Sequence, residues 1–494
     1  MTARYRRGGG WLRCTLAFMS FRQGRLAGFA AVVLAAAAAP AAHAFDAARE
    51  ASNYSKINER FQHVYGLDPD YQANLAALST ENELEYARIL ATDGPARPFG
   101  RDFTGNLCAH HGNGCAGDIR YYPWGDSEGA TVKRVLFTAR NGSTLSGHVW
   151  TSDACTKSCP GIVITNGSIQ APEELYWYAA ADLARAGYVV MTWDPQGQGW
   201  SDTYGEGADR FDGVPSQTGE PFYDGTEDAL DFFFSKPSSP YLPRPSCSTG
   251  TSHAVKQRAR VLDGRNAAYN PLYARLDTSR VGIAGHSLGA AAVSYIGQID
   301  PRVKAIVAWD NLRAPGPAPV TCPSGSSKRP DSTAAKPSLG MSADYGLTPT
   351  PYTSDPDRTA KSDAASQIAA AGVPAGELVI RGGTHYEFSF IPNPGFGGTL
   401  RGEDLAAWYT TAWFDRFVKG DRRADARLFT DRWRADADEA AVDPDHDGNL
   451  FSFYYDSPLW FDGRACQDLR TAQGCAPAPD GLGPFSALGA AFAM

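Results

Sequence analysis

The sequence predicts an α/β fold in which a mostly parallel sheet is flanked by helices. Two observations support this prediction. From residue 161 onward, short apolar runs of strand length alternate with longer segments of helical periodicity, and strands joined through helices form right-handed parallel units. Ahead of this alternation, Asn141-Gly142 separates two apolar runs, which is the pattern of a β-hairpin over residues 131–150.

The expected strands and helices follow one another closely. Strands are expected at 161–165, 188–193, 281–284, 303–309, 339–342 and 377–380. Helices are expected at 172–186, 224–234, 287–298, 359–371 and 403–418. Two Pro-rich stretches, 236–279 and 311–336, interrupt the alternation and are long for structureless loops. We expect them to form a lid or rim over one end of the sheet.

Both ends of the chain extend beyond this α/β unit of residues 131–420. Residues 45–130 predict an N-terminal helical extension, in which Thr80 and Glu83 have the spacing of a capping box that opens a second helix. Residues 421–494 form a C-terminal extension with its own pair of cysteines. Its segment 443–449 has the acidic spacing of a calcium loop, but the twelfth position is Tyr454 rather than Glu. A simple turn is the alternative, and we expect neither a metal ion nor another cofactor.

Composition narrows the class of protein. Of the 494 residues, 43% are hydrophobic and 20% are charged, which excludes a disordered chain and leaves room for one large domain or two. The six arginines of residues 1–44 come with no acidic residue, so the rest of the chain carries 40 basic and 54 acidic residues and a net charge of −14. Because such a chain repels phosphate backbones, a nucleic-acid partner is disfavoured.

Residues 1–44 have the pattern of a signal peptide. Arginines precede the Ala-rich apolar run 26–42, and Ala42-His43-Ala44 fits a cleavage site. This predicts a secreted or periplasmic protein with no integral membrane segment after cleavage, and an uncleaved membrane anchor is the alternative. Translation from Met19 would give a more compact export signal than translation from Met1.

Eight of the nine cysteines follow this segment. An even number of cysteines after an export signal favours disulfides. Spacing suggests three close pairs, and elimination leaves a fourth: Cys108–Cys115, Cys155–Cys159, Cys466–Cys475 and Cys247–Cys322. Zinc binding is the alternative for the first pair, because its loop contains His110 and His111.

The segment Gly285-His286-Ser287-Leu288-Gly289 carries the strongest chemical signal. It matches the pattern G-x-S-x-G and lies between an apolar strand and an Ala-rich helix, which is the context that a nucleophilic serine requires. The turn forces the serine into a strained conformation that exposes its hydroxyl, and the glycines let strand and helix approach. We therefore predict Ser287 as a nucleophile. A Gly-rich turn without chemistry is the alternative.

A serine needs a base, and nine histidines are available. Only His385 follows a late strand, after Gly382 and Gly383, at the end of the sheet where α/β proteins place their chemistry; His286 must point differently from its neighbour Ser287. For the carboxylate that orients the histidine we predict Asp344, after the penultimate strand. Asp310, which ends the preceding strand, is the alternative.

An oxyanion hole needs two backbone N–H groups. Leu288, which follows the nucleophile, offers one. The turn 166–169 after the first parallel strand offers the other, from Ser168 or alternatively Ile169. Close by in the sequence, Tyr176-Trp177-Tyr178 either lines an acyl or aromatic pocket or packs its helix against the sheet.

Several blocks in this order resemble the α/β-hydrolase superfamily over residues 131–420. They are 162–168, 183–194, Gly285-His-Ser-Leu-Gly289 and Gly383-Thr-His385. The loop 194–201 is similar to the superfamily pattern Asp-x-Arg-Gly-x-Gly-x-Ser, with Gln196 in place of the usual Arg. The segment 413–421 resembles cutinases, bacterial polyester hydrolases and dienelactone hydrolases, although these enzymes often place the acid two residues later, at the position of Gly346.

The resemblance implies a serine hydrolase that cleaves carboxylic esters through a Ser-His-Asp triad and a covalent acyl-enzyme. A small or polymeric ester is then the expected substrate. A peptidase or amidase with the same triad is the alternative enzyme, and a hydrolase-like binding protein without activity is the alternative of another class.

Overall fold

The structure is a computed structural model, and it describes residues 45–58, 69–93, 129–168, 171–319, 329–390, 398–429 and 450–475. The expected signal peptide, the Cys108–Cys115 pair, Cys322 and the calcium-like segment 443–449 lie outside the described residues. Within the described ranges, two expected disulfides are present, Cys155–Cys159 and Cys466–Cys475. Cys247 is also disulfide-bonded.

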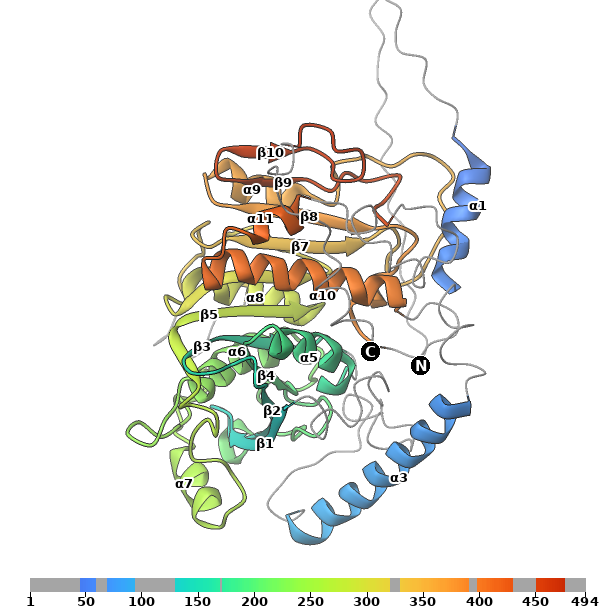
Figure 1. The fold of residues 1–494 in the computed structure, drawn as a ribbon. Helices are drawn as coiled ribbons and strands as arrows, with labels where there is room; N and C mark the ends of the chain where they lie inside the picture. Colours follow the sequence, from blue (N-terminus) through green and yellow to red (C-terminus); the bar gives the residue numbers. More distant parts are fainter. Residues whose placement is uncertain are drawn as a thin grey trace, which may run out of the picture. The chain divides into compact units, whose positions relative to one another are not determined.

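One mixed sheet of ten strands organises the chain (Figure 1). Its strand order is β1-β2-β4-β3-β5-β6-β7-β8-β9-β10. The strands from β4 to β8 run parallel, whereas β1, β2, β9 and β10 are joined by antiparallel pairing. The bounds are β1 Thr131–Thr138, β2 Thr144–Thr151, β3 Cys159–Thr165, β4 Val189–Trp193, β5 Leu276–His286, β6 Val303–Trp309, β7 Ser338–Ala343, β8 Ala375–Ile380, β9 Leu459–Phe461 and β10 Arg464–Cys466.

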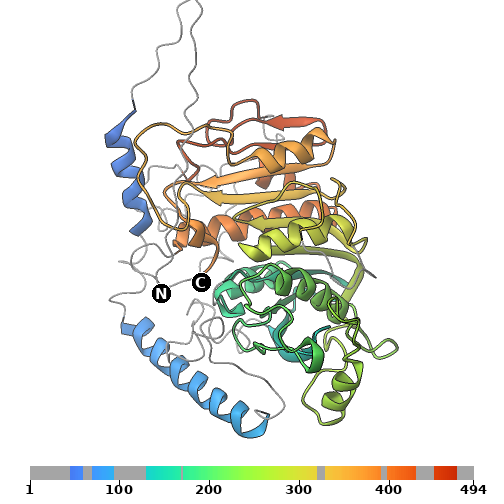
Figure 2. The ribbon, with the colours of Figure 1, turned by 180° about the vertical axis from the view of Figure 1, so that it is seen from behind.

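Helices cover both faces of this sheet. Helices α5 and α10 lie on the face toward the viewer in Figure 1, and α6 and α8 lie on the opposite face, which Figure 2 brings forward. Short helical turns flank them. The bounds are η4 Glu173–Tyr176, α5 Trp177–Arg185, η5 Gly207–Asp209, α6 Glu220–Phe233, α7 Ala254–Leu262, α8 Leu288–Ile299, α9 Asp363–Ala370, η6 His385–Phe388, α10 Leu400–Phe414, η7 Asp415–Lys419 and α11 Ala424–Leu428. The predicted α/β fold is therefore confirmed, with most boundaries within a few residues of those expected.

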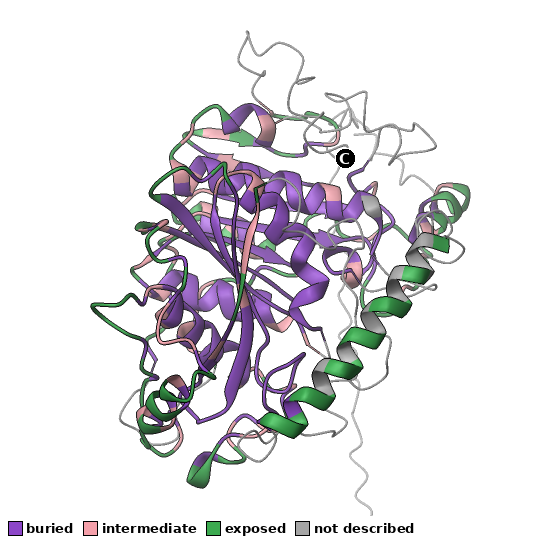
Figure 3. Ribbon diagram, turned by 60° about the horizontal axis from the view of Figure 1, so that its bottom comes forward, coloured by how far each residue is buried: buried purple, intermediate pink, exposed green. Residues whose placement is uncertain are grey.

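The core lies in two layers on either side of the strands. In β6, Val307 and Trp309 pack toward α5 and α10, whereas Ile306 packs toward α6 and α8. Figure 3 shows the sheet and these helices as almost entirely buried. Because both faces are covered, the parallel strands read in the sequence as continuous apolar runs rather than as alternating ones.

The N-terminal extension forms α1 (Ala47–Ser55), η1 (Lys56–Asn58) and α3 (Pro69–Thr92). The expected helix start at Thr80 is wrong, because α3 continues through it. The Thr80 hydroxyl donates to the carbonyl of Ala76 at 2.9 Å instead of capping a new helix, which is a bond that threonine commonly makes inside helices.

Neither the second half of the 236–279 stretch nor the C-terminal extension stands apart from the sheet. Helix α7 packs beside β1, where Gln257 accepts a hydrogen bond from the Thr138 amide at 2.9 Å. From the C-terminal extension, β9 and β10 lengthen the sheet beyond β8. Among the described residues, no helix is long and apolar enough to cross a membrane.

Candidate active site

Ser287 occupies a strained turn between β5 and α8. Its backbone has φ 57° and ψ −118°, a conformation that costs energy in any residue with a side chain. The flanking glycines make the turn possible. A Cβ on Gly289 would lie 2.3 Å from the carbonyl oxygens of Thr165 and Asn166, and one on Gly285 would lie 2.5 Å from the carbonyl oxygen of Gly289. The pattern G-x-S-x-G is therefore required here by close backbone packing.

A histidine and a carboxylate meet beside this turn. His385 begins η6, after β8, and its Nδ1 lies 2.6 Å from Oδ2 of Asp310. Asp310 follows β6 with φ 34°. Burial alone would raise the pKa of Asp310, but the hydrogen bond and charge of His385 outweigh it and lower the pKa. The side chains of His385 and Asp310 are only 13% and 14% exposed, so the pair is shielded from water.

The structure corrects the expected partner of His385. Asp344 directly follows β7, as expected, but its Oδ2 accepts hydrogen bonds from the Gly382 amide at 2.8 Å and from Asn53 of α1 at 2.9 Å. The carboxylate is therefore engaged on the side of α1, and the alternative residue Asp310 meets His385. Burial raises the pKa of Asp344.

The path of the loop after β8 explains this exchange. Residue Gly383 packs against Ala343 at the end of β7. His385 then reaches Asp310 at the end of β6, and its carbonyl oxygen lies 2.8 Å from Nε2 of His286 at the end of β5. The loop thus runs back across the carboxyl ends of three strands, and its histidine arrives above β6 rather than above its neighbour β7.

Of the two expected oxyanion donors, Leu288 adjoins Ser287 along the chain, and Ser168 lies in a turn that packs against Ser287 in space. Leu288 is the first residue of α8, where the amide has no partner within the helix. Ser168 follows Gly167 in the turn after β3, and a Cβ on Gly167 would lie 3.1 Å from Cβ of Ser287. This turn therefore packs directly against the serine. The alternative donor, Ile169, lies outside the described residues.

The aromatic triplet Tyr176-Trp177-Tyr178 is buried in the core layer of α5. These rings pack the helix against the sheet, which is one of the two roles expected of them. The Tyr176 hydroxyl also lies 2.8 Å from Nδ1 of His286. Sequence reasoning did not find this contact, because no spacing rule links a tyrosine after β3 to the residue before Ser287.

A buried acidic cluster stands beside the turn after β3. Asp194 accepts hydrogen bonds from the amides of Glu173 at 2.8 Å and Trp200 at 2.9 Å. Burial, reinforced by neighbouring carboxylates, raises the pKa of Asp194 to about 8 and that of Glu174 to about 8. Within the described ranges, no three His, Cys, Asp or Glu side chains are placed to hold a metal ion.

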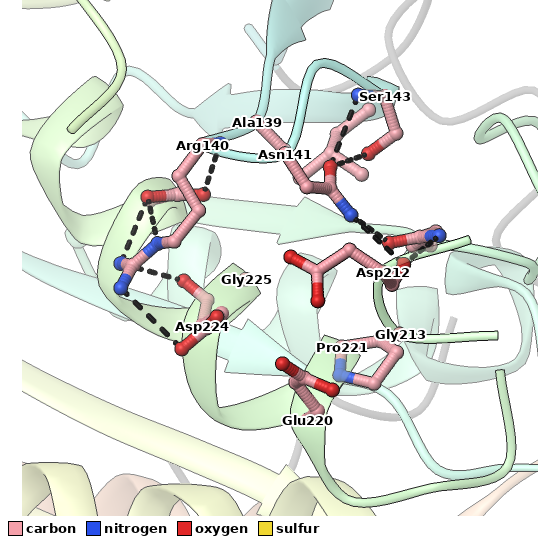
Figure 4. A pocket seen from close by; sticks show the side chains of 13 residues that line it. Ala139, Arg140, Asn141, Ser143, Asp212, Gly213, Glu220, Pro221, Asp224 and Gly225 are labelled. Carbon is pink, nitrogen blue, oxygen red and sulfur yellow. Dashed lines mark hydrogen bonds and ion pairs between the residues drawn. The ribbon is translucent and has the colours of Figure 1, made fainter. Parts of the chain in front are cut away.

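A small cavity, shown in Figure 4, lies between the β1–β2 hairpin and the start of α6. Its volume is about 20 Å³, which is room for one or two water molecules. Gln196, which stands in place of the usual Arg, donates there to the carbonyl oxygens of Thr203 and Asp212. Ser287, His385 and Asp310 are not among its lining residues, so the cavity is not where those side chains would meet a substrate.

Comparison with known proteins gives a similarity over part of the chain. No known family model matches the chain. Over 183 residues it is 29% identical to a protein of Fusarium sp. named hydrolase LUC6. The matched segment covers 36% of this chain and 33% of LUC6, so the chain spans about a third of the length of the relative that it matches.

Proposed function

We propose that this protein is a serine hydrolase with an α/β-hydrolase fold that cleaves carboxylic esters through Ser287, His385 and Asp310. The observation that carries the proposal is the combination of a strained serine at φ 57° with a buried His–Asp pair beside it. A parallel sheet with an antiparallel hairpin at one edge, and the similarity to a protein named as a hydrolase, support it.

The proposed role of His385 follows from its hydrogen bond to Asp310. Because the Asp310 carboxylate only accepts, Nδ1 of His385 carries the proton, and Nε2 is left as the base. Nε2 takes the Ser287 proton while Oγ attacks the ester carbonyl. The amides of Leu288 and Ser168 stabilise the oxyanion. The imidazolium then protonates the departing alcohol, and water, activated by the same nitrogen, hydrolyses the acyl-enzyme and restores the serine.

Ser287→Ala tests the proposal. We expect turnover of p-nitrophenyl esters to fall on the order of a million-fold, and an organophosphonate to label Ser287 stoichiometrically in the unchanged protein. The matched control is Ser294→Ala, which removes a hydroxyl of α8 that donates to the Ala290 carbonyl and accepts from the Arg313 amide. Activity retained by Ser287→Ala, with contamination excluded, contradicts the assignment.

Two further outcomes separate the alternatives. Preferential cleavage of p-nitroanilide peptides over the esters indicates a peptidase or amidase with the same triad. Absence of both turnover and adduct indicates a hydrolase-like binding protein.

We also propose that the protein is exported, from the signal-peptide pattern of residues 1–44. Mass spectrometry of the mature protein should find Phe45 at its N-terminus. Peptides from residues 1–44 in the mature protein would contradict cleavage at this site.

A further inference from the structure

His286, the residue before Ser287, is buried and bonded at both ring nitrogens. Its Nε2 lies 2.8 Å from the carbonyl oxygen of His385. A carbonyl only accepts hydrogen bonds, so this nitrogen carries the proton. Nδ1 therefore accepts, and its partner at 2.8 Å is the Tyr176 hydroxyl. Burial, together with the nearby His385, lowers the pKa of His286 to about 3, so the ring stays neutral.

The hydroxyl of Tyr176 extends these two bonds into a series of hydrogen bonds in which every donor faces the same way. Since its proton goes to His286, its oxygen is left to accept, and the Gly167 amide donates to it at 3.0 Å. The bonds thus run from the Gly167 amide through the Tyr176 hydroxyl and the His286 ring to the His385 carbonyl. One end of this chain is the turn that carries Ser168, and the other is the backbone of the proposed base.

We propose that Tyr176 and His286 are positioning residues, which hold the turn after β3 and the backbone of His385 in register with Ser287. The proposal rests on the function proposed above and deepens it. The Gly167 amide donates to Tyr176, and the next amide of the same turn, that of Ser168, is the one to which the proposed function assigns the oxyanion.

His286 and His385 lie side by side with ring centroids 4.7 Å apart, but their hydrogen-bond partners give them different roles. His385 is paired with a carboxylate that stabilises its charged form. His286 is held between a hydroxyl and a carbonyl, and neither partner carries the negative charge that would stabilise an imidazolium. His286 therefore stays out of proton transfer, and its contribution is geometric.

Packing supplies an alternative reason for Tyr176 to be where it is. Its ring lies parallel to that of Trp309, at 2° and 6.3 Å between centroids. Tyr176→Phe separates the two roles, because it keeps the ring and removes only the hydroxyl. Tyr241→Phe is the matched control, since Tyr241 is also buried and donates to a backbone carbonyl, that of Thr138 at 2.8 Å.

The first measurement does not depend on activity. Hydrogen–deuterium exchange, resolved to the Gly167 amide, should be about tenfold faster in Tyr176→Phe than in the unchanged protein, because the acceptor of that amide is gone. Tyr241→Phe should leave it unchanged. An equal exchange rate of the Gly167 amide in Tyr176→Phe and in the wild-type protein overturns the proposal, whatever the measured activity.

The second measurement is kcat and KM on p-nitrophenyl acetate. Misplacement of the turn should lower kcat about ten- to hundredfold in Tyr176→Phe while KM changes little. His286→Gln, which keeps an N–H for the His385 carbonyl, should retain more kcat than His286→Leu. Faster exchange with unchanged kcat overturns the positioning role. If the wild-type protein hydrolyses no ester and is not labelled by the phosphonate, the proposed function fails. The proposed catalytic role of the hydrogen bonds through Tyr176 and His286 then fails with it.

Discussion

Replacing Asp310 by Asn isolates the carboxylate that meets His385. The substitution keeps the size of the side chain and removes its charge. An Asn amide can donate to Nδ1 of His385, whereas the carboxylate only accepts from it. Donation at Nδ1 forces the histidine proton onto Nε2, the nitrogen that must receive the Ser287 proton. We therefore expect Asp310→Asn to stop catalysis by fixing the wrong tautomer while leaving the fold intact.

The magnitude follows from the geometry of the pair. At 2.6 Å, Asp310 makes a short hydrogen bond that strengthens when His385 becomes charged. Loss of the tautomer and of this stabilisation costs about ten-thousand-fold in kcat in triads of this kind, which is about 5.5 kcal/mol of transition-state stabilisation. Ground-state binding of an ester does not involve this carboxylate, so KM should stay within a few-fold.

Asp344→Asn is the matched control, because it neutralises a buried carboxylate at the end of the next strand. The bonds from Gly382 and Asn53 both go to Oδ2 of Asp344, so an amide oxygen in that place still accepts them. We expect kcat to fall less than about tenfold, since this side chain acts on the loop of His385 and not on the imidazole. The assay is kcat for both variants on one activated ester. A larger loss in Asp344→Asn than in Asp310→Asn refutes the assignment of the acid.

Three further predictions concern the fold around the site. Asn53→Leu should lower the free energy of unfolding in urea by about 1–3 kcal/mol, because it leaves a buried carboxylate without one of its donors; the exposed neighbour change Ser52→Ala should not. Burial raises the pKa of Glu377 to about 8, so its folded form keeps a proton that the unfolded chain loses above its ordinary pKa. Stability should therefore fall as pH rises from 5 to 8, by up to about 1.4 kcal/mol per pH unit, and Glu377→Gln should flatten that slope in urea titrations at the two pH values; an unchanged slope contradicts the burial argument. Gly289→Ala should cut ester turnover at least about a hundredfold, because its Cβ would lie 2.3 Å from two carbonyl oxygens of the turn after β3, whereas activity should survive Gly346→Ala, which meets open space.

The α/β fold could be predicted because its determinants are local. Each parallel strand is buried on both faces and reads as an apolar run, and each helix has its own periodicity. The antiparallel strands β9 and β10 were not predicted. They have three residues each, which is too short for a period to show. β9 pairs with β8 from more than seventy residues away along the chain, and β10 pairs with β9. Long-range pairing of this kind leaves no local signal.

At the site, the backbone turn at Ser287 could be predicted from the sequence, but the side-chain partner of His385 could not. Ser287 and its glycines are specified by a local turn, so one pentapeptide predicts the strained geometry. His385 was predicted from its place after the last parallel strand, and it does lie at the expected end of the sheet. Its partner depends on where a loop goes after it leaves β8. Asp344 and Asp310 follow neighbouring strands and lie at the same carboxyl end of the sheet. Which carboxylate the imidazole meets is decided only by the path of the loop back across β7 and β6.

The residue that was expected to complete the triad instead connects the site to the N-terminal helix. Asp344 is bonded to Asn53 of α1 and to the amide of Gly382, three residues before His385. In the same helix, Glu50 accepts hydrogen bonds from the hydroxyls of Tyr345 and Tyr454 at 2.8 and 2.6 Å. A helix that anchors β7, the loop of His385 and the C-terminal extension at once is structurally part of the unit that begins at residue 131. Although α1 belongs to the N-terminal extension by sequence, its buried polar contacts lie within a few residues of His385.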